Sequence, residues 1–294
     1  MAMSAETGYP LKNTPSSFLN TDSGAEIARQ MDQDLLITRA MGGLFVEHPD
    51  LMQVQQVLDV CCGPGGWALE LAFMYPHLEV TGIDKNRNMI DYARAQARVQ
   101  HLDNVFFHPM DVTQPLDFPD NSFDIVNARF IASFLTVDDW PRVVCELARI
   151  VKPGGIVRLT EFDEPGVSNS AAHERMKLLY GQALKRSNQS FYPLLEGPHR
   201  GITPMLEKFL RDAGCLYVCE QAHVINYSAG RRAAVANYEN LKVIYKLGQP
   251  FLLAAGVATQ DELDKLYDQM LLEMLSEDFR ALWYFLSVWG YKPE

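Results

Sequence analysis

One stretch decides the fold of this chain: Val57-Leu58-Asp59-Val60-Cys61-Cys62-Gly63-Pro64-Gly65-Gly66-Trp67. It begins with apolar, β-branched residues, passes through glycines, and runs directly into residues 68–72, whose composition favours a helix. This order predicts a strand, a tight turn and a helix N-terminus. Glycines let a ligand approach the backbone closely, and the first N–H groups of a helix have no partner within it. We therefore expect a small polar ligand at this turn.

The overall composition limits the classes of function. The chain has 294 residues, of which 48% are hydrophobic, and it carries a formal net charge of −11. Such a chain can bury one large α/β core, but its acidity argues against nucleic acid or anionic lipid as the principal partner. Arg231 and Arg232 are neighbours in the sequence, but they form only a pair. We therefore expect no nucleic acid partner and no membrane partner.

The cysteines and the hydropathy of the chain bear on its compartment. Five cysteines, an odd number, suit a reducing compartment better than a disulfide framework, and their spacing does not support a structural zinc site. No apolar run approaches the roughly 20 residues that span a bilayer. Residues 1–6 lack the apolar core of a signal peptide. We expect a cytoplasmic protein without a metal site.

Strand and helix patterns alternate up to residue 161. A helix at 24–41 precedes the first strand, and the clearest helix begins at Trp140, where apolar residues recur at steps of three and four. Such alternation predicts a parallel sheet that helices cover on both faces. The expected strands are 54–61, 78–84, 105–111, 123–129 and 156–160.

The regular alternation ends after Glu161. We expect a core at 51–228 that contains a cap insertion at 163–200, preceded by an arm and helix at 1–50 that form part of the cap. A second, helical cap insertion is expected at 229–280. Residues 281–294 then return to the core as a terminal strand, antiparallel to residues 216–227. A helix at 281–290 stays an open alternative.

The residues around the glycine turn narrow the choice of ligand. The pattern lacks the Lys-Ser/Thr of a phosphate loop, and its glycine spacing differs from the dinucleotide fingerprint. Asp59 lies in the end of the first strand, where a carboxylate would repel a pyrophosphate and favour a cationic ligand. Asp84 and Asp111 end the next two strands. All three acids therefore meet at the edge where α/β sheets bind ligands.

The motifs between Val57 and Glu161 resemble those of the class I S-adenosylmethionine-dependent methyltransferases. The first motif of that family reads acid-x-Gly-x-Gly-x-Gly. Asp59, Gly63 and Gly65 match it, whereas Cys61 stands at the first glycine position. The resemblance implies an α/β fold with a Rossmann-like seven-stranded sheet, mostly parallel with the last strand antiparallel, and a helical cap. It also implies S-adenosyl-L-methionine as the cofactor.

The resemblance assigns individual residues to the cofactor. Asp84 would bind the ribose hydroxyls, for which a carboxylate is a suitable acceptor. Asp111 and Val112 would contact the adenine, and Asn127 matches the position that contacts the methionine portion or the substrate. The expected cofactor-binding residues are Asp59, Cys61, Gly63, Gly65, Asp84, Lys85, Asp111, Val112 and Asn127.

The implied reaction is the in-line transfer of a methyl group from a sulfonium to a nucleophile. The leaving group is good, so alignment within about 3–3.5 Å and the exclusion of water matter most. A general base is optional and depends on the acceptor. The catalytic residues stay unknown, with four candidates near the predicted sheet edge: Glu161, His199, Arg129 and Tyr192.

The three cap segments carry the information about the substrate. Their Tyr, Phe, Leu and Met content suits an apolar or aromatic small molecule, although most of these side chains are expected to pack in the core. A small-molecule methyltransferase is the leading hypothesis. An RNA or protein methyltransferase, or a non-methylating protein that retains the cofactor, is the alternative. Whether O, N, C or S is methylated and the oligomeric state stay open.

Overall fold

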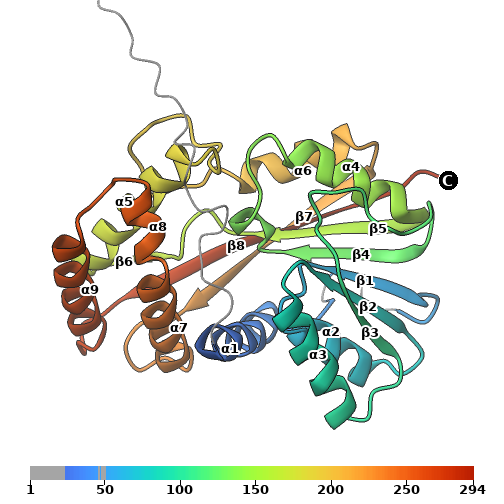
Figure 1. Ribbon diagram of the computed structural model, residues 1–294, viewed down its shortest axis with the longest axis horizontal. Coiled ribbons are helices and arrows are strands. Elements are labelled where there is room, and N and C mark those ends of the chain that lie inside the picture. Colours follow the sequence, from blue (N-terminus) through green and yellow to red (C-terminus); the bar gives the residue numbers. More distant parts are fainter. Residues whose placement is uncertain (1–23, 46, 48–50) are drawn as a thin grey trace, which may run out of the picture.

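The computed structural model describes residues 24–45, 47 and 51–294, and Figure 1 shows their arrangement. Residues 1–23, the first part of the arm and helix predicted at 1–50, lie outside the described residues. The strands are β1 (Gln56–Val60), β2 (Glu79–Asp84), β3 (Val105–Pro109), β4 (Phe123–Arg129), β5 (Val151–Glu161), β6 (Val167–Ser168), β7 (Leu216–Asn226) and β8 (Ala281–Tyr291). The helices are α1 (Gly24–Met41), α2 (Gly66–Met74), α3 (Arg87–Val99), α4 (Trp140–Ile150), α5 (Ala171–Arg186), α6 (Leu206–Asp212), α7 (Ala234–Leu247), α8 (Gln249–Ala254) and α9 (Gln260–Met274).

The strands form one mixed sheet in the order β3-β2-β1-β4-β5-β8-β6, and β7 pairs with the other edge of β8. Strands β1 to β5 pair in parallel, whereas β8 runs antiparallel to β5, β6 and β7. The predicted mostly parallel sheet with an antiparallel last strand is therefore confirmed. The pairing of β7 with β8 also decides the open alternative at residues 281–290 in favour of a strand.

The prediction of seven strands was wrong by one, because the described residues contain eight. The additional strand is β6, which has only two residues and pairs with the first residues of β8. A segment this short carries no alternation of apolar and polar residues, so periodicity does not reveal it. It extends the sheet only beside the cap helices (Figure 1).

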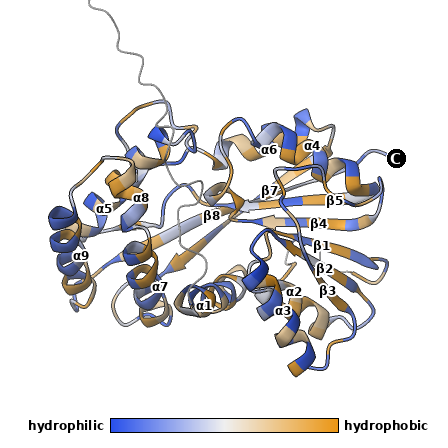
Figure 2. Ribbon diagram, in the orientation of Figure 1, coloured by the Kyte–Doolittle hydropathy of each residue, from blue (hydrophilic) through white to orange (hydrophobic). Residues whose placement is uncertain are grey.

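Helices cover the sheet on both faces, as Figure 1 shows. Helices α2 and α3 lie on one side and α4 and α6 on the other. In Figure 2, α3, α4 and α9 show both hydropathy colours, as expected of amphipathic helices with one buried face. Trp140, Val143 and Leu147 of α4 are buried against the sheet. The apolar spacing that predicts this helix therefore marks its packing face.

Helices α1, α5, α7, α8 and α9 lie beyond the carboxyl ends of the parallel strands and share one hydrophobic cluster. Ile37 of α1, Leu241 of α7 and Leu263 of α9 are fully or almost fully buried in it. Helix α9 begins with the predicted capping box, in which Thr259 and Glu262 bond reciprocally. This helical layer covers the edge of the sheet at which the three acids end their strands.

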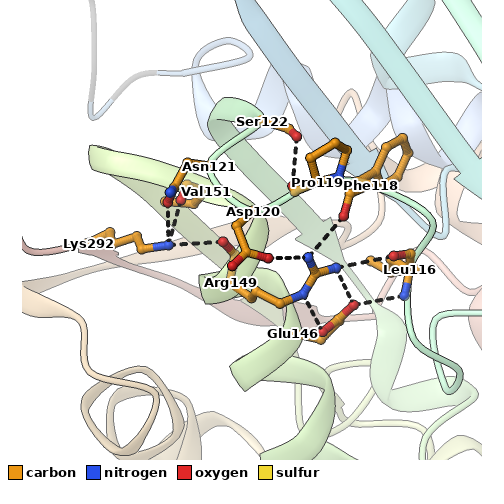
Figure 3. A network of polar contacts seen from close by, with 10 residues as sticks. All are labelled: Leu116, Phe118, Pro119, Asp120, Asn121, Ser122, Glu146, Arg149, Val151 and Lys292. Atoms are coloured by element: carbon orange, nitrogen blue, oxygen red, sulfur yellow. Dashed lines mark hydrogen bonds and ion pairs between the residues drawn. The ribbon is translucent and has the colours of Figure 1, made fainter.

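A polar network around Arg149 of α4 lies at the opposite edge of the sheet, where β4 and β5 begin (Figure 3). Its guanidinium pairs with Glu146 at 2.7 Å and Asp120 at 2.6 Å, and donates to the backbone oxygens of Leu116 and Phe118. Lys292 donates to the backbone oxygens of Arg149 and Val151. These bonds join α4 to the loop before β4 and to the end of the chain, far from the edge with the acids.

Candidate active site

The turn between β1 and α2 has the backbone geometry that its glycines allow. Gly63 and Gly65 have φ angles of 53° and 84°, in the left-handed region. A Cβ atom at Gly65 would lie 2.8 Å from the Phe107 ring and 2.9 Å from the Ala93 side chain, so any larger residue clashes there. The chain therefore passes closely over β3 and α3 before it enters the helix.

Cys61 also adopts the left-handed conformation, with φ 55°. An L-residue with a side chain pays roughly 1–2 kcal/mol for this conformation. Cys61 stands where the motif that the sequence resembles has its first glycine, and glycine adopts a positive φ without this cost. Burial and the nearby Asp84 carboxylate raise the pKa of the Cys61 thiol well above its ordinary value, so it stays a neutral thiol.

Asp84 at the end of β2 holds the glycine turn in place. Its Oδ2 accepts a hydrogen bond from the Gly63 N–H at 3.1 Å, and its Oδ1 accepts one from the Asn86 N–H at 2.8 Å. Asn86 in turn caps α3 by accepting from two backbone N–H groups. Burial raises the pKa of Asp84 above its ordinary value, although the two N–H donors oppose the shift. A half-buried carboxylate therefore faces the turn.

Asp111 follows β3 and forms the next side of the site. Its Oδ1 accepts from the backbone N–H of Thr113 at 2.9 Å and from the Thr113 hydroxyl at 2.8 Å. Both bonds involve the same oxygen. The carboxylate thus belongs to a tight turn after β3 and faces the same cavity as Asp84.

A cavity at the carboxyl ends of β1, β2 and β4 connects these residues. Of the predicted cofactor residues, Cys61, Gly63, Asp84, Lys85, Asp111 and Val112 line it. Asp59, Gly65 and Asn127 do not, because they lie behind the turn. The other lining side chains include Met89, Met110, Phe130, Phe134, Phe162 and Ile244. One end of the cavity is therefore acidic and the other is apolar.

Asp59 and Asn127 lie next to each other in the register of β1 and β4, and Arg158 of β5 continues the row. Asn127 Nδ2 donates to Asp59 Oδ1 at 2.8 Å, and Arg158 Nη1 donates to Asn127 Oδ1 at 2.8 Å. Arg158 also pairs with the buried Glu47. Burial raises the pKa of Asp59 to about 7, against the opposing effect of Arg129. This row forms a buried polar support behind the glycine turn.

Helix α1 contributes side chains that sequence reasoning missed. Asp34 forms an ion pair with Arg129 at 2.7 Å and accepts the backbone N–H of Trp67 at the start of α2. Gln30 lies directly over Gly63, where its side chain would collide with any Cβ at that position. In the sequence, the polar residues Gln30, Gln33 and Asp34 recur at steps of three and four, which places them on one face of the helix. This pattern could have indicated that they belong to the site.

The apolar end of the cavity is formed by aromatic residues. The rings of Phe130 and Phe162 lie 5.4 Å apart, and the Trp283 ring packs 5.1 Å from Phe162. Phe130 follows β4 with φ 59°, a conformation that is uncommon for a bulky side chain. The neighbouring aromatic rings hold this turn, and no sequence pattern predicts that Phe130 or Phe162 belongs to the site.

The four catalytic candidates have different environments. Arg129 lines the cavity, but Asp34 pairs with it and the Trp67 ring lies 5.7 Å from its guanidinium. Glu161 does not line the cavity, since it is buried on the other face of β5 and accepts the Ala132 N–H at 3.0 Å. Burial raises the pKa of Glu161 to about 8. Its neighbour Phe162 points into the cavity, because successive residues of an extended chain face opposite sides.

The two loop candidates lie together outside the cavity. The rings of Tyr192 and His199 are 5.3 Å apart, and His199 Nδ1 lies 3.7 Å from a carboxylate oxygen of Glu164. Neither residue lines the cavity. In the described part of the chain, no three His, Cys, Asp or Glu side chains group as metal ligands. Within the same residues, no helix has the length and apolar character needed to span a bilayer.

Comparisons with known proteins identify the family of the chain. A family model described as a methyltransferase domain matches residues 57–155. A demethylmenaquinone methyltransferase from Listeria welshimeri is 32% identical over 199 residues, which cover 64% of this chain and 80% of that protein. Another from Geobacillus kaustophilus is 38% identical over 112 residues, covering 38% of this chain and 47% of the relative.

Solved structures show the same fold at low sequence identity. Phosphoethanolamine N-methyltransferase 2 from Haemonchus contortus, solved with S-adenosyl-L-methionine, has a TM-score of 0.56 and 20% identity, covering 94% of this chain and 58% of that chain. The YcgJ protein from Bacillus subtilis has a TM-score of 0.55 and 17% identity, and the match covers 87% of this chain and 99% of that chain. These likenesses support the fold, and the Listeria relative supports the family. The chain belongs to the class I S-adenosylmethionine-dependent methyltransferases and is an enzyme of that family.

Proposed function

We propose that this enzyme methylates a small organic acceptor with an apolar or aromatic ring. The observation that carries the proposal is the apolar end of the cavity, where Phe130, Phe162 and Ile244 face the space beyond the acidic end. Aromatic side chains favour flat apolar ligands, and few polar groups are available there to bind a sugar or a peptide backbone. The relatives are named for demethylmenaquinone, which extends the proposal to an acceptor of that kind.

We place the cofactor along the acidic end. Asp84 would accept hydrogen bonds from the ribose hydroxyls, and Asp111 with Val112 would contact the adenine. The glycine turn at Cys61 and Gly63 would lie against the methionine portion. Arg129 would attract its carboxylate, and Asp34 its ammonium group. Asp59, Gly65 and Asn127 would act from behind the turn by holding its shape.

The residues present fit this cofactor, but the cavity must widen. Its free volume is about 160 Å³, below the roughly 300 Å³ at which ligand pockets of proteins usually begin. Gln30 and Asp34 of α1 take up space at the methionine end, where Gln30 covers Gly63 and Asp34 lies close to Gly66. We infer that the Gln30 side chain moves aside when the cofactor enters, while the glycine turn keeps its place.

The cofactor supplies an activated methyl group on a positively charged sulfur. The chain's own residues would then hold the acceptor in line with that group and keep water out. Phe130 and Phe162 would orient a ring by packing against it. Glu161, Tyr192 and His199 do not line the cavity, so we propose catalysis by alignment, without assigning a general base.

A transfer assay with methyl-labelled S-adenosylmethionine tests the proposal. We expect label in a reduced demethylmenaquinone analogue, and a Phe162→Ala variant should raise the KM for that acceptor more than it changes the affinity for the cofactor. Phe73→Ala is a matched control, because Phe73 is an exposed residue of α2. Labelling of RNA or protein, with no labelling of ring acceptors, would overturn the proposed acceptor class.

A further inference from the structure

A second cavity lies between α1, the end of β7 and α7, outside the candidate active site. Its volume is about 1080 Å³, slightly above the roughly 300–1000 Å³ typical of ligand pockets. Apolar residues form much of the walls, and the larger apolar side chains among them are Leu35, Leu36, Val224, Ile225, Val235 and Val243. We call this cavity the α1–α7 groove.

Several of these apolar side chains are open to solvent. Val235 is 75% exposed, Val224 49% and Leu35 39%, although each is a large aliphatic residue. Single exposed aliphatic residues are ordinary, but a concave group of them with a polar rim is typical of a ligand groove. The groove therefore offers a site for a hydrocarbon surface.

Three exposed arginines, Arg39, Arg231 and Arg232, line the same groove. None of them forms an ion pair with a residue that the structure describes. The sequence shows only the adjacent pair, and the fold adds Arg39 from α1. In a chain with a net charge of −11, three arginines that have no carboxylate partner among the described residues make a local site for an anion.

Two carboxylates also line the groove, and they narrow the choice of anion. Glu239 pairs with Lys242 at 3.1 Å, whereas Asp32 is exposed on α1. A doubly charged phosphate would meet more repulsion from these groups than a singly charged carboxylate. The planar guanidinium also matches the two oxygens of a carboxylate.

A polar layer separates the groove from the candidate active site. Arg29 lines both cavities, and its guanidinium bonds to Glu26 and to Asn240 of α7, each at 2.7 Å. Glu26, Arg29 and Asn240 are all buried. The groove is therefore a site of its own, and its occupation does not depend on the proposed acceptor.

We propose that the α1–α7 groove binds one molecule of an amphiphile with a hydrocarbon chain and a carboxylate head group. The hydrocarbon chain lies along the side of α1 that lines the groove and packs against Leu35 and Leu36; this side extends from Ala25 to Ala40 over roughly 22 Å at 1.5 Å per residue. Arg39, Arg231 and Arg232 hold the carboxylate at the rim.

The fluorescent fatty acid cis-parinaric acid, titrated below its micellar concentration into the full chain, tests this site. We expect saturable binding with one site per chain. The double variant Arg231→Gln with Arg232→Gln should weaken binding by about tenfold or more, since it removes charge-assisted bonds to the head group. Val235→Asp should weaken it as well, because it places a charge against the chain. The methyl ester of the probe lacks the carboxylate charge. Its affinity for the unaltered protein should therefore be no higher than the affinity of the acid for the arginine double variant.

The matched control is Arg142→Gln with Arg211→Gln, which removes two exposed arginines from α4 and α6. It should bind the probe like the unaltered protein, and thermal melting checks that every variant is folded. Equal binding by the two double variants, or by acid and ester, would overturn the proposal. Binding to phosphatidylglycerol vesicles without binding to the monomeric probe would also overturn it, in favour of a membrane-docking face. Cofactor binding, measured separately, reports on the active site alone.

Discussion

Substitution of Asp84 gives the sharpest test of the proposed cofactor site. Asp84 faces the cavity from the end of β2, and its two oxygens accept the backbone N–H groups of Gly63 and Asn86 at 3.1 and 2.8 Å. Each oxygen has a second lone pair, so the carboxylate can bind two ribose hydroxyls while it holds the turn. Removal of the Asp84 carboxylate should therefore weaken cofactor binding more than it destabilises the fold.

The size of the effect follows from the bonds that are lost. A hydrogen bond to a charged group contributes about 1.5–3 kcal/mol. Asp84→Ala removes two such bonds to the ribose, about 3 kcal/mol or more, which corresponds to a Kd roughly 150-fold higher. Asp84→Asn keeps one acceptor oxygen and the side-chain volume, so a Kd about tenfold higher is expected.

Isothermal titration with S-adenosylmethionine, and again with S-adenosylhomocysteine, measures these values. Asp91→Asn is the control, because Asp91 is an exposed residue of the neighbouring α3 with a side chain that is 71% accessible. Thermal melting of each variant without ligand separates lost binding from lost folding. If both Asp84 variants are folded and bind within about threefold of the unaltered protein, the placement of the ribose on Asp84 is refuted.

Three further predictions follow from the site. The pKa of Asp59 is raised from 3.8 to about 7, so the folded state binds the proton more tightly than the unfolded chain does. The protonated Asp59 therefore contributes fully to stability below pH 3.8. This contribution, about 4 kcal/mol in total, is lost as the pH rises to about 7. Urea unfolding of Asp59→Asn should show a weaker pH dependence over this range, and an equal dependence contradicts the assignment. Cys61→Gly should leave the free energy of unfolding unchanged or raise it by up to about 1 kcal/mol, because glycine adopts the left-handed conformation without strain. Chemical denaturation measures this free energy. A decrease of about 2 kcal/mol or more would show that the packing of the thiol matters more than the backbone strain. Gln30→Ala should increase the association rate constant for S-adenosylmethionine roughly twofold or more in stopped-flow measurements, since it removes the side chain that covers Gly63. An unchanged or lower rate constant would contradict the inference that the Gln30 side chain must move before the cofactor binds.

Local patterns predicted those parts of the site that depend on neighbouring residues in the chain. The apolar run before Asp59, the glycines after it and the acids at the ends of β2 and β3 are short-range features, and parallel strands bring their carboxyl ends to one edge. Asp84, Asp111 and the glycine turn accordingly meet in the structure at one cavity. The antiparallel β8 was predicted from its β-branched and aromatic content and the resemblance together.

Other residues required the tertiary structure. Glu161 and Phe162 are neighbours in the sequence, but only Phe162 reaches the cavity, and the face that each one takes depends on the pairing of β5 with β4 and β8. Gln30 and Asp34 lie far from the glycine turn in sequence, so their position over it follows from the packing of α1 against α2. Periodicity predicts α1 but not its partner.

The sequence by itself determined the alternation of strands and helices, the turn from Asp59 to Gly66 and the family. It did so because these features rest on contacts and dihedral preferences within a few residues. Only the tertiary structure decided that Asp34 pairs with Arg129, that the cavity has an apolar end, and that Arg39 lines one groove with Arg231 and Arg232. Each of these depends on how helices from distant parts of the chain pack over the sheet edge, and side-chain periodicity carries no information about that packing.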